Sequence, residues 1–254
     1  MKIRILGSGT SSGVPRIGND WGACDPAEPR NRRTRVSALI EYSDTRILID
    51  TGPDMREQLL AANIATVDAV LWTHDHADHC HGIDDLRQLF HNARAPVCGF
   101  ARAATLASLQ SRFDYVFADR AGYRATVSGR LLPDMITLGP IEVRCTDQPH
   151  GSIESAGLRF DTDRGSIGYA TDFSEVTPGM LALYRDVDIL VVDALREAPH
   201  PTHPSLDEAI AFARNCRAGR TVLIHMDHSM DYASVCDSLP AGVEPGYDGM
   251  ELVL

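Results

Sequence analysis

The stretch His74-Asp75-His76-Ala77-Asp78-His79 places three histidines and two aspartates within six residues. It follows a mainly apolar run, residues 67–72, which predicts a buried β-strand ending at the motif. Imidazole nitrogens and carboxylate oxygens are ligands that zinc, manganese and iron accept. The alternative is a polar surface loop that is rich in histidine by chance, but no structural role needs this density of histidine. The stretch therefore predicts a metal site.

One loop cannot supply every ligand of a metal pair, so other ligands must come from elsewhere in the chain. Four candidates lie at or beyond the ends of short strand-like runs: Asp50, His150, Asp172 and His225. A single residue at such a place is more often hydrogen-bonded than metal-bound. Polar groups of layered α/β proteins nevertheless gather at these loop edges. Together with residues 74–79, the four positions indicate one site built from several strands.

With these residues the chain resembles the metallo-β-lactamase fold hydrolases. The pattern is His74-x-His76-x-Asp78-His79 followed by distant His150, Asp172 and His225, and the resemblance extends over residues 7–250. Within that superfamily the chain is most similar to the PhnP-like phosphoribosyl cyclic phosphate phosphodiesterases. The resemblance implies a four-layer αββα sandwich, with two mixed sheets face to face and helices outside. We expect one such domain over residues 1–254.

The resemblance also implies how two divalent ions are held. One ion would be bound by His74, His76 and His150, the other by Asp78, His79 and His225, and Asp172 would bridge them. Asp50 would orient a ligand histidine by accepting its second N–H group. The ions would be Zn²⁺ or Mn²⁺, since these ligands accept both. Two ions about 3.5–4 Å apart can supply a metal-bound hydroxide at neutral pH and clamp a phosphate. Asp78 would supply negative charge that balances the two cations, and we therefore also predict a catalytic role for it.

A second histidine-containing segment, residues 199–205, follows the apolar run 189–193. In PhnP-like enzymes a histidine at the place of His203, just before a helix, assists phosphoryl transfer. A titrating imidazole suits the protonation of a leaving alkoxide, so the resemblance assigns this catalytic role to His203. The alternative is a histidine at a helix start with no role, and His200 is a weaker candidate.

A structural zinc is not expected. Some PhnP-like members carry one on an N-terminal cysteine cluster and a histidine at the position of His228. Here residues 19–25 contain only Cys24. A closed structural zinc site takes four ligands, which this segment does not provide.

The charge of the chain bears on its partners. The formal net charge is −11, from 24 basic and 35 acidic residues. Nucleic-acid binding relies on many Lys and Arg contacts to phosphates, so we expect a small phosphodiester substrate and no nucleic acid. The basic cluster Arg30, Arg32, Arg33 and Arg35 could contact phosphate or RNA. We expect it to be a solvated connector or a subunit contact, which leaves a homodimer open.

Local patterns give the remaining expectations. Gly7-Ser8-Gly9-Thr10 resembles a dinucleotide loop, but no helix pattern follows it, so we expect a turn that lines the site. Helices are expected over residues 83–93, 101–117, 178–184 and 205–215. The last begins with Ser205 and has Glu208 at the capping-box position.

The sequence thus predicts a binuclear phosphodiesterase acting on small or cyclic phosphodiesters, phosphoribosyl cyclic phosphate or nucleotide-like. Scattered cysteines, no bilayer-length apolar run and no signal-peptide pattern indicate a cytoplasmic enzyme. A tRNA 3′-end nuclease should show a long basic insertion, which is not seen. A glyoxalase II-type thioesterase should have a helical domain after His225. A catalytically inactive metal-binding protein should lack a ligand, and none is missing.

Overall fold

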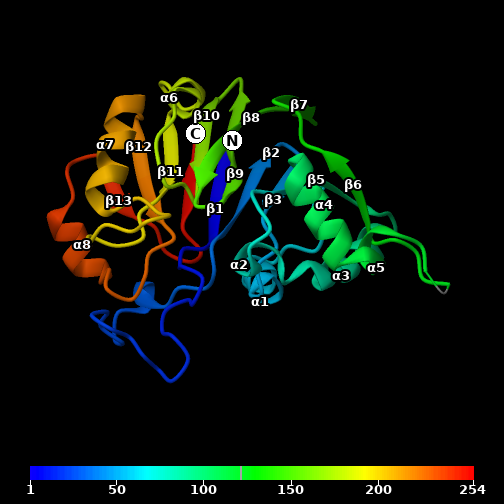
Figure 1. The fold of residues 1–254 in the computed structure, drawn as a ribbon, viewed down its shortest axis with the longest axis horizontal. Helices are drawn as coiled ribbons and strands as arrows, with labels where there is room; N and C mark the ends of the chain where they lie inside the picture. The colour runs from blue at the N-terminus through cyan, green and yellow to red at the C-terminus, as the bar shows by residue number, and fades with distance from the viewer. Residues whose placement is uncertain (121) are drawn as a thin grey trace.

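Residues 1–120 and 122–254 are described by the computed structural model of the protein. Across those residues the strands form two seven-stranded sheets (Figure 1). The first sheet contains, in spatial order, β14 (Glu251–Val253), β1 (Lys2–Gly7), β2 (Ser37–Tyr42), β3 (Thr45–Ile49), β4 (Ala69–Trp72), β5 (Val97–Ala101) and β6 (Val127–Leu131). The second contains β13 (Val243–Pro245), β12 (Arg220–Ile224), β11 (Ile189–Asp193), β10 (Gly165–Ala170), β9 (Ile153–Thr162), β8 (Ile141–His150) and β7 (Met135–Leu138).

Both sheets are mixed in the same way. In the first sheet, β14 to β3 pair antiparallel and β3 to β6 pair parallel. In the second, β7 to β10 pair antiparallel and β10 to β13 pair parallel. The parallel halves bring the carboxyl ends of successive strands to a common edge, where the loops that follow can share a site.

Strand residues alternate between two buried environments. Ile47 and Ile49 of β3 pack into the core between the two sheets, whereas Leu48 faces the outer helices of the first sheet. Because side chains alternate across a strand, a strand covered on both faces must be apolar throughout. Each such buried side chain contributes about 1.5–3 kcal/mol.

The helices form the two outer layers. They are α1 (Met55–Ala61), α2 (Ala77–Cys80), α3 (Leu86–Ala93), α4 (Ala103–Arg112) and α5 (Asp114–Phe117) on the first sheet's side, and α6 (Pro178–Leu183), α7 (Leu206–Cys216) and α8 (Tyr232–Ser238) on the second's. The predicted αββα sandwich is therefore confirmed. Among the described helices, none combines the length and the apolar character that a bilayer crossing requires.

Three of the four predicted helices are confirmed. Ser205 and Glu208 form a complete capping box at the start of α7, and α6 covers the predicted segment 178–184. Residues 83–93 form a 3₁₀ turn, η2 (Ile83–Asp85), followed by α3. The single helix predicted over 101–117 is wrong. Ala101 pairs with strands on both sides in the sheet, and the non-helical backbone at Phe113, with φ of −128° and ψ of 42°, separates α4 from α5.

The expectation that Arg30–Arg35 is a solvated connector is wrong for Arg33, which is 2% exposed. Its guanidinium donates to the carbonyls of Asp227 at 3.1 Å and Met230 at 2.6 Å, and to Asn31 Oδ1 at 3.3 Å. The segment of residues 13–35 folds back onto residues 227–231. The Arg33 guanidinium donates there to backbone carbonyls that form no hydrogen bonds within a β-sheet. We call Arg33 with these three partners the Arg33 junction.

The other members of the basic cluster behave differently. Arg30 forms an ion pair with Glu28 at 2.7 Å, and Arg35 with Asp54 at 3.0 Å. Arg32 is exposed. The glycine loop before the cluster forms a turn, as predicted, and Gly9 pairs with Arg35 on one side and Met226 on the other. A Cβ on Gly9 would lie 2.8 Å from the Arg33 side chain, so this close approach requires glycine.

Candidate metal centre

The candidate ligands come together at the carboxyl edge of both sheets. Asp50, His74, Asp172 and His225 follow β3, β4, β10 and β12, and His150 is the last residue of β8. The backbone is left-handed at three of them, with φ of 63° at Asp50, 53° at Asp172 and 60° at His225. Such a conformation is uncommon for residues other than glycine. It persists only where the surrounding structure holds the backbone in place, and it is concentrated at functional sites. It turns each side chain sharply out of its strand.

The first predicted ligand group is assembled as expected. Ligand atoms of His74, His76 and His150 all lie within 4.8 Å of one another. His150 Nδ1 lies 3.0 Å from the carbonyl of Thr202, which leaves its Nε2 facing His76 Nδ1 at 3.3 Å. His74 Nδ1 lies 3.1 Å from the Thr73 hydroxyl. Two of the rings are thus held through one nitrogen and present the other to a common point.

The second predicted group is assembled in the same manner. Ligand atoms of Asp78, His79 and His225 lie within 4.8 Å of one another. Asp78 Oδ2 lies 3.4 Å from His79 Nε2 and 3.6 Å from His225 Nε2. Asp78 and His79 share the short helix α2, whose start at Ala77 turns both toward the centre.

Asp172 lies between the two groups. Its Oδ1 is 3.9 Å from His74 Nε2 and 3.7 Å from His150 Nε2 in the first group. The same carboxylate reaches His79 Nε2 at 3.3 Å and His225 Nε2 at 3.4 Å in the second. One carboxylate in reach of both groups is the arrangement that a bridging ligand requires.

Asp50 lies behind His79, as its predicted orienting role requires. Its Oδ2 is 2.7 Å from His79 Nδ1, and both the backbone N–H and the hydroxyl of Thr73 donate to the carboxylate at 2.8 Å. Burial raises the pKa of the Asp50 carboxyl, and the neighbouring His79 opposes that rise. With His79 Nδ1 engaged in this way, Nε2 is left to face Asp172 and Asp78.

The buried polar atoms of the centre fit divalent cations. In the described chain, Nε2 of His74, His79 and His225 is buried and has no hydrogen-bond partner. A buried polar atom without a partner costs about 1–3 kcal/mol. Burial disfavours the charged form of Asp172, but His225, His79 and His74 outweigh it and hold the pKa of this carboxyl well below its ordinary value. Unpaired imidazole nitrogens around ionised carboxylates are a donor set that Zn²⁺ or Mn²⁺ would complete.

His203 lies at the edge of the centre. Its Nδ1 is 2.7 Å from Asp193 Oδ2 and 3.8 Å from Asp172 Oδ1. Its ring stacks on His225, with centroids 4.7 Å apart and planes at 18°. His200 accepts a hydrogen bond from the Thr202 N–H at 3.3 Å and does not share the carboxylate. The two rings lie side by side, with centroids 5.2 Å apart, but only His203 is held by a carboxylate of the centre.

Asp193 is a site residue that the sequence reasoning missed. It is fully buried, accepts from the backbone N–H of Asp172 at 3.1 Å, and lies 3.9 Å from His225 Nδ1. Its carboxylate also fixes the orientation of His203. The signal was present, because Asp193 ends the apolar run of β11 just as Asp50 follows that of β3.

The region of the doubted structural zinc holds other contacts. Cys24 is buried with its Sγ 3.8 Å from Arg33 Nη1. His228 Nε2 lies 3.6 Å from Asp20 Oδ2. All groups of three or more potential ligands found among residues 1–120 and 122–254 belong to the centre described above.

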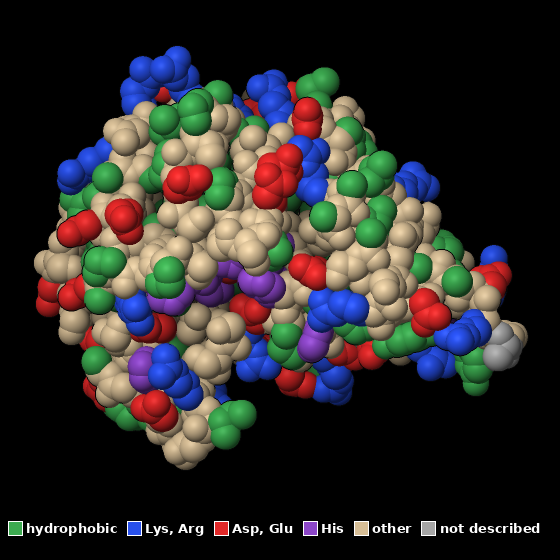
Figure 2. Space-filling model, viewed as in Figure 1, with side chains coloured by type: hydrophobic (Ala, Val, Ile, Leu, Met, Phe, Trp, Pro, Cys, Tyr) green, Lys and Arg blue, Asp and Glu red, His purple; other side chains and the backbone are tan. Residues whose placement is uncertain are grey.

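Two cavities flank the centre. One of about 1020 Å³ is lined by Asp75, Arg102 and residues on both sides of His150. The other, about 450 Å³, is lined by Arg16 and Arg196 together with Asp227 and His228, which follow His225. Figure 2 shows the histidine side chains gathered in a crevice of this face, with basic and acidic side chains beside it. A substrate with groups on both sides of a reacting bond could extend into both cavities.

The chain matches a protein-family model. Residues 45–226 match the model described as β-lactamase superfamily domain. This range contains every predicted ligand, from His74 to His225, and also Asp50, the predicted orienting residue. A crystal structure titled as a new diphosphatase from the PhnP family superposes with a TM-score of 0.90 and 37% identity, covering 99% of this chain and 97% of that one.

Curated relatives are also similar. An octanoyltransferase of Porphyromonas gingivalis is 32% identical over 266 residues, covering 100% of this chain and 52% of that protein. A ribonuclease Z of Methanopyrus kandleri is 29% identical over 143 residues, covering 54% of this chain and 48% of that protein. The chain thus spans about half the length of these curated relatives.

Proposed function

This chain is a metal-dependent hydrolase that belongs to the β-lactamase superfamily, in its PhnP-like branch, and we propose that it hydrolyses small or cyclic phosphodiesters with two divalent ions. Candidate substrates are phosphoribosyl cyclic phosphates and nucleotide-like diesters. The observation that carries the proposal is Asp172, which lies within reach of both ligand groups. The 37% identical diphosphatase supports cleavage at a phosphorus–oxygen bond.

The proposed ions are Zn²⁺ or Mn²⁺. His74, His76 and His150 would hold one, Asp78, His79 and His225 the other, and Asp172 would contact both. When bound, the pair would supply a water activated near neutral pH and would neutralise charge on the non-bridging phosphate oxygens. Asp78 and Asp172 bring negative charge that balances the cations, and Asp50 keeps His79 in the tautomer whose Nε2 faces the centre.

His203 is the proposed general acid. Asp193 accepts the Nδ1 proton of its ring, so Nε2 is the atom that exchanges a proton with the substrate. In the cationic form, Nε2–H can donate to the leaving oxygen as the phosphorus–oxygen bond breaks. Asp193 stabilises that cation and holds the ring against His225. The pair thus delivers a proton beside the ligands without itself binding an ion.

The cavity beside His225 supports an anionic substrate. Arg16 and Arg196 line it, and within the described residues neither guanidinium has a carboxylate within 4.0 Å. Asp227 is also in the wall, but its Oδ1 accepts from the N–H and hydroxyl of Ser229 at 2.7 and 2.6 Å. The Arg196 guanidinium donates to the carbonyls of Ala198 and Pro199, which fix its position but do not neutralise its charge. We propose that the two arginines receive a second anionic group of the substrate. We propose a small cytoplasmic phosphodiester as that substrate.

A hydrolysis panel tests the proposal. Protein reconstituted with Mn²⁺ or Zn²⁺ should cleave bis(p-nitrophenyl) phosphate and ribose cyclic phosphate, and should leave phosphomonoesters nearly intact. The Asp172→Asn variant prepared in parallel is the control for contaminating hydrolases. Thioester cleavage of lactoylglutathione without any phosphodiester cleavage would overturn the proposal. Precursor tRNA belongs in the same panel, because the ribonuclease Z relative favours that substrate as the second candidate.

A further inference from the structure

One end of the first sheet, with the helices that cover it, is rich in arginine. Residues 86–131, which we call the basic lobe, form α3, β5, α4, α5 and β6 on one side of the molecule (Figure 1). They contain seven arginines and two aspartates, with no lysine or glutamate, in a chain whose net charge is −11. Arg102, Arg112 and Arg120 are ion-paired with carboxylates. The other four arginines have no carboxylate within 4.0 Å among the described residues, and such unpaired positive charge in an acidic protein favours anionic ligands.

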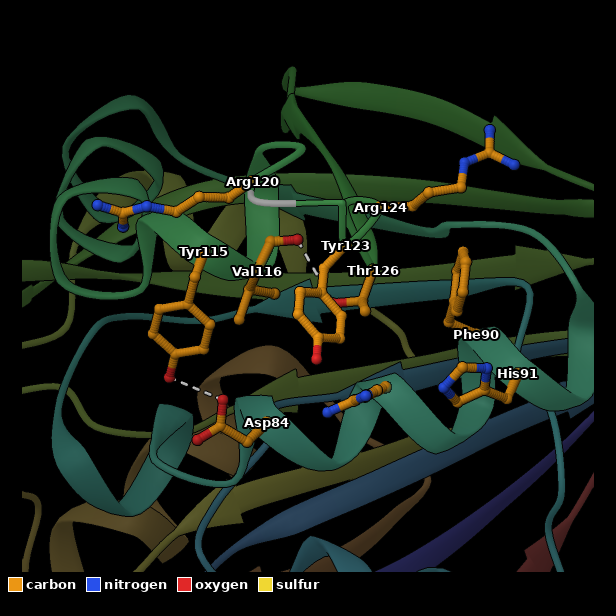
Figure 3. Close-up of a pocket in the computed structure, with 10 residues that line it drawn as sticks. Asp84, Phe90, His91, Tyr115, Val116, Arg120, Tyr123, Arg124 and Thr126 are labelled. Atoms are coloured by element: carbon orange, nitrogen blue, oxygen red, sulfur yellow. Dashed lines mark hydrogen bonds between the residues drawn. The ribbon is translucent and has the colours of Figure 1, made fainter.

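The lobe contains a cavity of about 450 Å³ between α3 and the α5–β6 segment (Figure 3). This volume lies within the range of small-molecule sites. Tyr115 and Tyr123 enter from the α5–β6 side, and Phe90 and His91 belong to α3 on the other side. Three aromatic rings therefore border a space that is separate from the residues of the metal centre.

The two tyrosine rings are exposed and yet oriented. Tyr123 is 69% exposed and Tyr115 is 47% exposed, so neither ring serves to fill the core. The Tyr115 hydroxyl donates to Asp84 at 2.7 Å. The guanidinium carbon of Arg87 lies 5.5 Å from the centre of the Tyr123 ring. Arg87 thus covers one face of the Tyr123 ring, and an exposed ring held in this way is suited to stack on a planar ligand through its other face.

The arginines of the cavity differ in their partners. Arg120 forms an ion pair with Asp114 at 2.8 Å, and Figure 3 shows its side chain directed away from the rings. For Arg87 and Arg124, the described chain provides no carboxylate within 4.0 Å. The nearby Asp84 is engaged by the Tyr115 hydroxyl. Arg87 lies at the Tyr123 ring, whereas Figure 3 shows the Arg124 side chain directed outward above Phe90. Both guanidinium groups are therefore without a carboxylate partner in the described chain and can pair with an anion at the rim of the cavity.

We propose that this cavity binds a nucleoside phosphate. The base would stack on the ring of Tyr123, and the phosphate would be bound by Arg87 and Arg124. Aromatic stacking tolerates any base, and guanidinium groups recognise phosphate through paired hydrogen bonds. The combination selects a ligand that carries both a planar ring and a phosphate. This binding site does not depend on the hydrolysis proposed above.

Calorimetric titration of the metal-loaded protein with AMP, adenosine and ribose 5-phosphate tests the site. AMP should bind, and each of its halves should bind at least tenfold more weakly. Tyr123→Ala should weaken AMP binding about tenfold, whereas Tyr123→Phe, which keeps the ring, should stay within threefold of the parent. Arg124→Gln should weaken binding and reduce its salt dependence. Arg185→Gln, an exposed arginine outside the lobe, is the charge-matched control.

A short oligoadenylate distinguishes the source of the nucleotide. If the oligoadenylate binds as tightly as AMP, the ligand of the site is a free nucleotide. If it binds more than a hundredfold more tightly than AMP, the ligand is a single strand whose further nucleotides contact the basic lobe. Unaltered metal content and hydrolysis rate in each variant would show that it has folded. No heat of binding at 1 mM AMP, or equal losses in Tyr123→Ala and Tyr123→Phe, would overturn the proposal. If the parent protein is a dimer that does not bind AMP, and the Tyr123→Ala variant is a monomer, then the ring is a subunit contact. That result would also overturn the proposal.

Discussion

The candidate metal centre and the Arg33 junction are two buried polar clusters that include His225 and Asp227, the residues before and after Met226. They differ in how far their polar atoms find hydrogen-bond partners within the protein. In the metal centre, Nε2 of His74, His79 and His225 is buried without a partner among the described residues. In the Arg33 junction, Nη1 and Nη2 donate to three oxygens, Nη1 also donates to Cys24 Sγ, and only Nε has no partner in the described part of the chain. Burial alone therefore does not mark function. Convergent buried atoms left without partners indicate a ligand, whereas a satisfied cluster indicates a structural link.

The largest expected effect comes from the residue between the two ligand groups. Asp172→Asn keeps the shape of the side chain and removes the charge that would face both ions. We expect hydrolysis to fall by about 10³-fold or more, because several kcal/mol of transition-state stabilisation depend on the ions. Elemental analysis should show fewer ions per chain than in the parent. A variant that keeps two ions and the full rate would place the bridging role elsewhere.

The next largest effect is expected from replacing His203, which lies at the edge of the candidate metal centre. His203→Ala should lower kcat on an alkyl phosphodiester by about 10²–10⁴-fold with metal content unchanged, because the leaving alkoxide needs a proton. The loss should be smaller for p-nitrophenolate, which leaves as an anion. His200→Ala is the neighbouring control and should be mild, since His200 does not contact Asp193. Equal losses on both leaving groups would argue against a general acid, and loss of metal would make His203 a ligand.

Arg33 tests the other cluster. Arg33→Met removes a shared donor from three acceptors. Asn31 Oδ1 keeps the Tyr232 N–H and the Asp227 carbonyl keeps the Met230 N–H, whereas the Met230 carbonyl is left without a donor, which costs about 1–3 kcal/mol for a buried group. We expect the free energy of unfolding to fall by about 3 kcal/mol, measured by urea unfolding, while activity per folded molecule stays near the parent value. Arg32→Met is the matched control and should change stability by less than about 0.5 kcal/mol. If Arg33→Met lost metal and kept its stability, the contrast between the clusters would fail.

The smallest expected effect concerns Asp231, which borders the Arg33 junction. Its carboxylate caps α8 through the Ser234 N–H at 3.0 Å and accepts from Asn31 Nδ2 at 2.7 Å. Burial opposes ionisation, but these hydrogen bonds outweigh it and lower the pKa of Asp231 to about 2. Asp231→Ala should cost about 1 kcal/mol at neutral pH, as typical for an N-cap.

The pH dependence of that cost has a definite sign. A carboxyl whose folded pKa lies below its unfolded value stabilises the fold above the unfolded pKa of 3.8 and loses this contribution as pH falls toward 2. Unfolding curves of the parent and of Asp231→Ala should therefore converge between about pH 4 and pH 2. Curves that stay equally far apart across this range would mean that the ionised carboxylate is not the stabilising group.

The convergence of the candidate ligands could be predicted because each occupies a place that local sequence reveals. Residues 74–79 are dense in donors, and Asp50, Asp172 and His225 follow apolar runs whose ends must meet at one edge of the sheets. Asp193 obeys the same rule and was missed because no family pattern drew attention to it. The burial of Arg33 could not be predicted, since two of its three partners are backbone carbonyls of residues 227 and 230, which no side-chain pattern discloses. The break at Phe113 likewise depends on packing against the sheet.

The left-handed backbone at Asp50, Asp172 and His225 has a consequence for mutagenesis libraries. At these three positions a replacement must satisfy two separate demands, the chemistry of the side chain and a φ near +60°. Asparagine and glycine meet the second demand, whereas valine and isoleucine do not. Randomising these codons and selecting for folded protein alone should therefore enrich asparagine and glycine and deplete β-branched residues. Selection of the same library for activity should instead enrich the parent residues, aspartate or histidine, because only these also meet the demand on side-chain chemistry.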